Sequence, residues 1–395
     1  MTIRTLAFAA LTCLPLAGGA QSLFPHWQTL ILGNNPDLLS ETRSTAAANA
    51  DELTGLTLAD PEVNVSYMLG VPSDVPNKTN IEVTQTFDFP TMSGARRRLA
   101  KAQGRVQDAA LMARRSQLAL EVEKALIEYV YASRLTAELE EWDALSARML
   151  AEADTALKAG TMTIMEHNGI SLQSLAARDE LDASRVELAS TLAALRRLNG
   201  GKPLENLPQD WPDASLPPSL EEWTELAMRV NPELEQAGAA LELASREVDL
   251  RKKQGLPEFS VGYVNELVKG GNYHGASIGF SLPLWGNRGR VKGAEALRQA
   301  AEESLQSARE SFALKAQADW ERATMLRQVW ERYERAWAEA SAMTERHLST
   351  ALQKKAISIT DWLGARATLK EYAMRRLQAA REWQLARAEL YAPTL

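Results

Sequence analysis

The sequence carries the same pattern of residues twice, 196 positions apart. A long internal repeat constrains the fold strongly, because it means that one structural unit is built twice along the chain. The matched positions include Trp27, Asn35, Pro36 and Leu38 against Trp223, Asn231, Pro232 and Leu234, and 61–67 against 257–263. We expect each copy to supply a helix, two strands, a very long helix and a return helix.

Two long windows of the sequence lack proline, from 91 to 202 and from 284 to 392. Both are rich in good helix formers, and apolar residues such as Leu135, Leu139 and Trp142 recur at spacings of three and four. This pattern predicts long antiparallel helical hairpins. A helix from 94 to 158 would extend roughly 100 Å at ~1.5 Å per residue. The second long helix is expected over 290–355.

Each helical window has one internal break, at 158–163 and at 354–361. Gly160 and Ala356 are again 196 positions apart, so we expect them to occupy matching places in the two turns. Gly160 suits a helix C-terminus, and Thr163 or Thr360 is expected to cap the helix that follows.

Four short segments alternate between apolar and polar residues, which is the signature of β-strands. Val63, Val65 and Tyr67 alternate with Asn64 and Ser66, and the same rule holds for the other segments. The loops at 71–77 and 269–272 have turn chemistry. The sequence therefore predicts two β-hairpins, at 61–90 and at 257–283.

These elements define the domain organisation. Residues 1–20 are expected to be a signal peptide, because Arg4 precedes an apolar run that ends in small residues. The first repeat covers 21–202 with its helical hairpin at 94–199. A proline-rich linker follows at 203–219. The second repeat covers 220–395 with its helical hairpin at 290–391.

Composition excludes several functions. The formal net charge is −7, which argues against nucleic acid as a partner. No nucleophile elbow, phosphate-binding glycine loop or zinc spacing is present, so we expect neither an enzyme nor a cofactor. The single cysteine, Cys13, lies in the signal region. It is either removed with the signal or used as a lipid anchor.

The fold class expected is mainly α with a small β part. No segment after the signal carries the ~18 or more apolar residues of a transmembrane helix, so membrane spanning would require a closed β-barrel. Four strands are too few to close one, whereas three copies would supply twelve. Apolar and aromatic residues, with Phe87, Phe89 and Trp285 at strand ends, would then face lipid. The residues expected in the lumen are Asn64, Ser66, Glu82 and Asp88.

A resemblance to a known family rests on three features of the sequence. They are the paired motifs Asn35-Pro36-Asp37-Leu38 and Asn231-Pro232-Glu233-Leu234, the run from 277 to 288, and the two turns. The chain resembles the TolC-like outer-membrane efflux family across nearly all of its mature sequence. The family usually has glycine at both turns, and Ala356 departs from that pattern.

The resemblance implies a homotrimeric duct in the outer membrane of a Gram-negative bacterium, with a long periplasmic extension. It implies a periplasmic adaptor and an inner-membrane pump as partners, and contact with outer-membrane lipid. Within the family, the sequence resembles the metal-cation efflux branch most. Drug efflux and type I protein secretion are the alternatives within the family. A periplasmic coiled-coil adaptor or scaffold is the alternative outside it.

The resemblance also implies roles for the two turns, called here the helical tips. Asp361 is a candidate for an aperture carboxylate, against the alternative that it caps the returning helix. Glu166 is a second candidate, against a solvated surface charge. The residues expected to dock partners are Lys158, Gly160, Thr161, Met162, Lys354, Ala356, Ile357 and Ser358.

Methionine and histidine cluster beside the first tip, at Met162, Met165 and His167. Thioether and imidazole groups suit copper(I). Packing or docking explains methionine near a turn more simply. We therefore expect no metal site.

Overall fold

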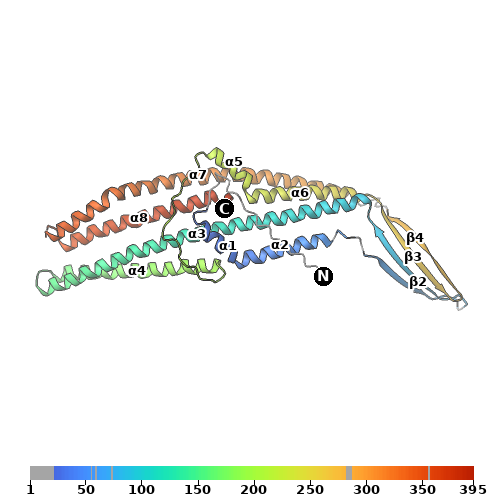
Figure 1. The fold of residues 1–395 in the computed structure, drawn as a ribbon, viewed down its shortest axis with the longest axis horizontal. Coiled ribbons are helices and arrows are strands. Elements are labelled where there is room, and N and C mark those ends of the chain that lie inside the picture. Colours follow the sequence, from blue (N-terminus) through green and yellow to red (C-terminus); the bar gives the residue numbers. More distant parts are fainter. Residues whose placement is uncertain (1–21, 55, 58–59, 73, 282–286, 355) are drawn as a thin grey trace, which may run out of the picture. The chain divides into compact units, whose positions relative to one another are not determined.

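The structure is a computed structural model that describes residues 22–395 except 55, 58–59, 73, 282–286 and 355 (Figure 1). The expected signal peptide at 1–20 and Trp285 lie outside the described residues. The described chain divides into two compact units. Unit 1 contains the described residues up to Asn35, Ser116–Trp223 and Ala318–Leu395. Unit 2 contains Pro36–Arg115 and Thr224–Gln317, so each half of the sequence contributes to both units.

The same order of elements occurs in both halves of the chain. The first half contains α1 (Pro25–Asn34), α2 (Pro36–Thr54), β1 (Glu62–Met68), β2 (Lys78–Phe87), α3 (Pro90–Lys158) and α4 (Ile164–Leu198). The second contains α5 (Leu220–Val230), α6 (Pro232–Lys253), β3 (Glu258–Val268), β4 (Gly271–Ser281), α7 (Asn287–Gln353) and α8 (Ile359–Tyr391). A short 3₁₀ turn, Ala392–Thr394, ends the chain.

The Asn-Pro motifs divide the first helical segment of each half into two helices, where the sequence predicted one. Asn35 and Asn231 adopt extended backbone angles, with ψ of 119° and 115°. The residue before proline is disfavoured in a helix, whereas proline suits the first helical position. Asn231 also caps α6, because its side chain accepts a hydrogen bond of 2.8 Å from the backbone N–H of Glu233.

The long helices pack against different partners along their lengths. In unit 2, the early part of α3 contacts α2 and α6 through Asn49–Asp108 and Arg105–Glu242. In unit 1, α4 folds back along α3, and α8 folds back along α7 through the Arg322–Glu389 pair (Figure 1). Both long helices begin earlier than expected. Pro90 starts α3 because proline favours the first helical turn, although the sequence also placed it at a strand end.

Each unit has its own apolar core. In unit 1, Trp142, Met149 and Ala153 of α3 pack with residues of α4 and with Trp362 and Leu363 of α8. In unit 2, Met92 and Ala95 of α3 pack with Leu250 of α6 at the base of the sheet. Among the described helices, none is both long and apolar enough to cross a membrane.

The four strands form one antiparallel sheet in the order β1-β2-β3-β4. Each hairpin supplies two neighbouring strands, and β2 joins the hairpins by pairing with β3 from Lys78↔Val268 to Phe87↔Phe259. The sheet thus places strands from both halves of the sequence side by side in unit 2.

Candidate functional site

The register of the sheet places most polar side chains on one face and most apolar side chains on the other. Asn64 pairs with Glu82, and Ser66 pairs with Asn80, so these four residues share one face. The polar face continues across β3 and β4 through Ser260, Gly262, Glu266, Gly275, Ser277 and Gly279, and it also carries Val264, Val268 and Tyr273. Three of the four expected lumen residues, Asn64, Ser66 and Glu82, therefore lie together.

Asp88 differs from that expectation, because β2 ends at Phe87. Its carboxylate is ion-paired with Arg96 of α3, whose Nη2 donates a 3.0 Å hydrogen bond to Asp88 Oδ1. Asp88 therefore ties the end of β2 to the start of α3. The strand alternation could not reveal this, since the partner lies in the next element.

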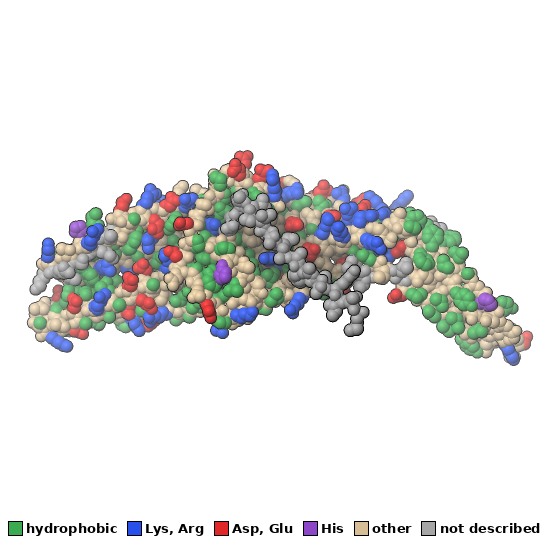
Figure 2. Space-filling view, in the orientation of Figure 1, with side chains coloured by type: hydrophobic (Ala, Val, Ile, Leu, Met, Phe, Trp, Pro, Cys, Tyr) green, Lys and Arg blue, Asp and Glu red, His purple; other side chains and the backbone are tan. Residues whose placement is uncertain are grey.

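The opposite face of the sheet is apolar and uncovered. Val65 of β1 is 67% exposed, and Ile278 and Phe280 of β4 are 81% and 72% exposed. Figure 2 shows hydrophobic side chains gathering over the sheet. A soluble antiparallel sheet buries its apolar face against a core. This sheet has the reverse arrangement, since no described residue covers its apolar face, and exposed apolar surfaces of this kind are typical of contact sites.

Small residues pack closely on the polar face. A Cβ added at Gly262 would lie 2.5 Å from Ser277 Oγ and 3.0 Å from the Val83 carbonyl oxygen. A Cβ at Gly279 would lie 2.5 Å from Ser260 Oγ. Serine hydroxyls thus occupy the space above the glycines, and larger side chains at these glycines would disturb the pairing of β3 with its neighbours.

The first helical tip has a well-defined backbone geometry. Gly160 has a φ of +69°, its N–H bonds to Leu157 O, and the N–H of Thr161 bonds to Ala156 O. These two bonds form a Schellman motif, in which glycine accepts the left-handed conformation at little cost. The sequence assigned this role to Gly160 correctly.

Glu166 belongs to the cap of α4. Thr163 Oγ1 accepts a 3.2 Å bond from the Glu166 N–H, while Glu166 Oε2 accepts bonds of 2.9 Å and 2.7 Å from Thr163 N and Oγ1. The backbone N–H of Thr163, followed by its hydroxyl, lowers the pKa of Glu166 below its ordinary value. This is a capping box, and its Thr-x-x-Glu pattern was visible in the sequence.

The second tip repeats this cap with Ser358 and Asp361. Ser358 Oγ accepts a 3.0 Å bond from the Asp361 N–H and donates a 2.7 Å bond to Asp361 Oδ2. Thr360, the expected cap, is therefore replaced in that role by Ser358. Asp361 therefore takes part in capping α8, which is one of the two roles considered for it. Its carboxylate is exposed.

The two tips match at a spacing of 195 residues, whereas Gly160 and Ala356 suggested 196. The N–H of Ala356 bonds to Ala351 O, as that of Thr161 bonds to Ala156 O. Ala356 is therefore the counterpart of Thr161, and the position that matches Gly160 is 355, outside the described residues. With this alignment the departure from glycine falls on Lys355 and not on Ala356.

The remaining tip residues divide into two groups. Met162 and Ile357 are partly buried and pack against the core around Trp142 and Trp362. The others are exposed, namely Lys158, Gly160, Thr161, Lys354, Ala356 and Ser358. These exposed residues are the ones that a docking partner can contact.

Of the three residues beside the first tip, His167 and Met162 have other partners, whereas Met165 is 77% exposed. His167 Nε2 lies 2.5 Å from Asp154 Oδ1, and Met162 packs against the core. Among the described residues, no group of three or more His, Cys, Asp or Glu side chains is placed to hold a metal ion.

A buried carboxylate in unit 1 was missed by the sequence analysis. Glu123 of α3 is 1% exposed and accepts hydrogen bonds from the Ser22 hydroxyl and, at 2.8 Å, from the Leu23 N–H. Burial raises the pKa of Glu123, while Ser22, Leu23 and Arg387 oppose that shift. Arg387 Nη1 lies 4.0 Å from Glu123 Oε1. The group fastens the segment before α1 to α3 and α8.

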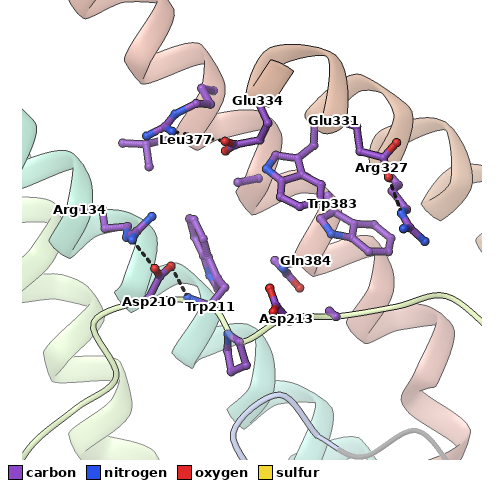
Figure 3. Close-up of a pocket in the computed structure, with 15 residues that line it drawn as sticks. Arg134, Asp210, Trp211, Asp213, Arg327, Glu331, Glu334, Leu377, Trp383 and Gln384 are labelled. Carbon is purple, nitrogen blue, oxygen red and sulfur yellow. Dashed lines mark hydrogen bonds and ion pairs between the residues drawn. The ribbon is translucent and has the colours of Figure 1, made fainter. Parts of the chain in front are cut away.

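The linker between the repeats closes a cavity of about 650 Å³ in unit 1 (Figure 3). Asp210 of the linker forms a 2.5 Å ion pair with Arg134 of α3, whose guanidinium lies 5.7 Å from the Trp211 ring. On the other side, Arg327 of α7 lies 6.0 Å from the Trp383 ring. Trp383 is 0% exposed, so this wall is packed core. The contacts with Arg134 attach the linker to α3, and the Tyr391 hydroxyl of α8 donates a 3.1 Å hydrogen bond to the carbonyl oxygen of Ser215 in the linker.

Comparison with known proteins identifies the fold. No model of a known family matches the sequence, and a search of curated proteins finds no match. A membrane protein from Pseudomonas aeruginosa is 16% identical, with a TM-score of 0.75 over 100% of this chain and 99% of that one. CusC, described in connection with transmembrane channel formation, is 17% identical, with a TM-score of 0.75 over 95% and 93%.

The Campylobacter jejuni CmeC outer membrane channel is 14% identical, with a TM-score of 0.74 over 100% of this chain and 93% of that chain. The expected TolC-like fold, mostly helical with a four-stranded antiparallel sheet, is thus confirmed. At these identities the comparison establishes the fold alone.

Proposed function

We propose that this chain is one subunit of an exit duct in the outer membrane of a Gram-negative bacterium. The duct conducts substrate passively, and a separate pump supplies the energy. The observation that carries this proposal is the reversed polarity of the sheet, whose apolar face is uncovered while its polar face is packed with small side chains. Its fold, which solved outer-membrane channels share, supports the same function.

The proposed duct requires several copies of the chain. A sheet inserted in lipid has to satisfy every backbone hydrogen-bonding group, and a closed barrel achieves this. Among the described strands, β1 pairs only with β2 and β4 only with β3. Joining β4 of one copy to β1 of the next closes the ring, and three copies give twelve strands.

The polar face of the sheet lines the lumen in this assembly. Asn64, Ser66 and Glu82 face the water path, while Asp88 lies at its rim in the ion pair with Arg96. The apolar face contacts the hydrocarbon of the outer membrane.

The helical tips serve as the aperture and the docking surface. Three copies of Asp361 would place a ring of exposed carboxylates at the tips, where such a ring favours cations over anions. Glu166 supplies a second ring. The exposed tip residues Lys158, Thr161 and Lys354 contact a periplasmic adaptor, which links the duct to an inner-membrane pump. The helices occupy the periplasm. The proposed signal peptide would direct export of the chain to that compartment.

The cargo proposed is metal cations, on the basis of the sequence resemblance and the carboxylates of lumen and tips. Drug efflux and type I protein secretion use the same physical path, so cargo is decided by the pump. Deleting the gene and measuring tolerance to zinc, cobalt, copper and several antibiotics separates these classes. Lower metal tolerance supports the cation assignment, whereas drug sensitivity alone contradicts it.

The conduit itself is tested with purified full-length protein in planar bilayers. Discrete conductance steps that prefer potassium over chloride are expected. A protein that inserts without conducting, or that remains in the aqueous phase, contradicts the proposal.

A further inference from the structure

Basic side chains gather where helices α3, α6 and α7 meet the sheet of unit 2. We call this group the basic collar. Its members are Arg96, Arg97, Arg98, Lys101, Arg251, Lys252, Lys253, Arg288, Arg290 and Lys292. They come from three segments that are separate in the sequence, so no local sequence pattern connects them.

Packing contacts bring these helix ends together. Met92 and Ala95 at the start of α3 pack against Leu250 near the end of α6. Lys253 Nζ donates a 3.4 Å hydrogen bond to the carbonyl oxygen of Thr91. The end of α6 also meets the start of α7, since Lys252 lies 3.1 Å from Glu295.

The collar carries a surplus of positive charge. Acidic partners neutralise some of it, through the ion pairs Arg96–Asp88, Arg251–Glu247 and Lys252–Glu295. Glu258 adds one more carboxylate, beside Arg97 in a hollow at the end of β2. Of the other seven cations, Lys253 is partly buried, and six are exposed and form no ion pair with a described residue, namely Arg97, Arg98, Lys101, Arg288, Arg290 and Lys292.

Two stretches of the collar helices contain no acidic residue. None occurs from 90 to 107 on α3 or from 287 to 294 on α7. The chain as a whole carries a net charge of −7, so this local surplus runs against its overall balance. A solvated helix face of this chain would be expected to mix both signs, as the rest of its helices do.

The collar borders the apolar face of the sheet. Figure 2 shows Lys and Arg side chains concentrated on the helices next to the hydrophobic surface of the strands. If the sheet crosses the membrane, as proposed above, the collar lies at the depth of the lipid headgroups. Cations next to an apolar band match the anionic phosphates of lipids, and arginine binds phosphate through paired N–H groups.

We propose that the basic collar binds anionic phospholipid headgroups in the leaflet next to the helices. The interaction selects phosphatidylglycerol-type lipids over zwitterionic ones and fixes the depth of the sheet in the membrane. This inference rests on the proposed function, because it requires an inserted sheet.

The test uses full-length protein reconstituted in phosphatidylcholine bilayers. Spin-labelled phosphatidylglycerol and spin-labelled phosphatidylcholine, added separately, report the fraction of each lipid that the protein immobilises. Wild-type protein is expected to prefer the anionic lipid by roughly fivefold, consistent with the attraction of a few basic side chains near a surface. The preference is expected to disappear at ~1 M salt, where the Debye length falls to about 3 Å.

The collar variant replaces Arg97, Arg98, Lys101, Arg290 and Lys292 with glutamine and is expected to lose the preference. A charge-conserving variant, Arg97→Lys with Arg98→Lys and Arg290→Lys, is expected to keep it. A matched control changes five exposed cations away from the collar, by Arg309→Gln, Lys315→Gln, Arg332→Gln, Arg335→Gln and Lys354→Gln. The control is expected to behave as wild type.

Equal immobilisation of the two lipids by wild-type protein overturns the inference, as does a collar variant that keeps the full preference. Conductance measured in the same bilayers separates this result from the proposed function. Protein that conducts without a lipid preference contradicts only the collar. Protein that fails to insert contradicts the duct, and the collar with it.

Discussion

At the scale of single residues, the two helical tips use the same device. Thr163 with Glu166, and Ser358 with Asp361, form reciprocal side-chain caps on α4 and α8. The carboxylates hold the first turn of each return helix and remain exposed. One residue can therefore both cap a helix and contribute charge to an aperture, and substitutions that separate the two roles are available.

Replacing Asp361 with asparagine removes its charge and keeps an oxygen that accepts a bond from Ser358. We expect Asp361→Asn to reduce the preference for cations in planar bilayers while hydrogen exchange at the start of α8 stays close to wild type. Asp361→Ala should lose both properties. Unchanged ion preference in both variants would remove Asp361 from the aperture.

The cap at the first tip predicts a pH dependence. The pKa of Glu166 is lowered in the folded chain, so the cap contributes stability above the ordinary carboxyl range near 4.5, and this contribution is lost as the pH falls through the folded pKa. Amide protection at the start of α4 should therefore decline on acidification. Thr163→Ala, which costs a helix about 1 kcal/mol at this position, should reduce protection already at neutral pH. Equal protection in variant and wild type across the acidic range would contradict the cap's role.

The buried Glu123 predicts a dependence of opposite sign. Its folded pKa is raised by burial, so its contribution to stability is greatest below the unfolded value of 4.5 and declines as the pH rises through the folded pKa. The melting temperature of the wild type minus that of Glu123→Gln should therefore fall from about pH 4 to pH 8, because only the wild type has a buried carboxyl group that ionises. Calorimetry of the detergent-solubilised protein measures it. A wild-type melting temperature that rises relative to that of Glu123→Gln with increasing pH would contradict a raised pKa of Glu123.

At the scale of elements, the sheet determines how the chain meets its surroundings. Neighbouring residues on one strand face opposite sides, so Val65 and Ser66 form a matched pair. We expect Val65→Arg to destabilise the inserted sheet by up to about 2–4 kcal/mol, because its side chain would enter lipid. Ser66→Arg should insert normally and change ion preference instead.

Unfolding of both variants in lipid vesicles with urea compares the two costs directly. Equal destabilisation by Val65→Arg and Ser66→Arg would show that the two faces of the sheet meet the same medium.

Local patterns predicted the elements well, because strand alternation and helical spacing are properties of short stretches of sequence. Val63, Val65 and Tyr67 revealed β1, and Gly160 revealed the end of α3. Features that depend on distant contacts stayed hidden. Glu123 is buried by Ser22 and Leu23, about 100 positions away, and the collar joins three separate helix ends. The tip alignment failed because the two halves differ in length between their elements, so a spacing of 196 at Asn35 and Asn231 becomes 195 at the caps Thr163 and Ser358.

At the scale of the whole molecule, the described part of the chain leaves two kinds of surface uncovered. The apolar face of the sheet has no partner within the described residues, and the outer strands β1 and β4 each pair on one side only. Three copies would complete these surfaces with the same contact repeated around one axis, which is a closed cyclic assembly. Lipid would then cover the outer surface of the ring.

The number of chains in the detergent-extracted particle tests this account most directly, and native mass spectrometry of the purified full-length protein measures it. Three chains are expected in each particle, held together until the sheet unfolds. A particle that stays a single chain in the mildest detergent, with the amides of β1 and β4 exchanging freely with water, would contradict it.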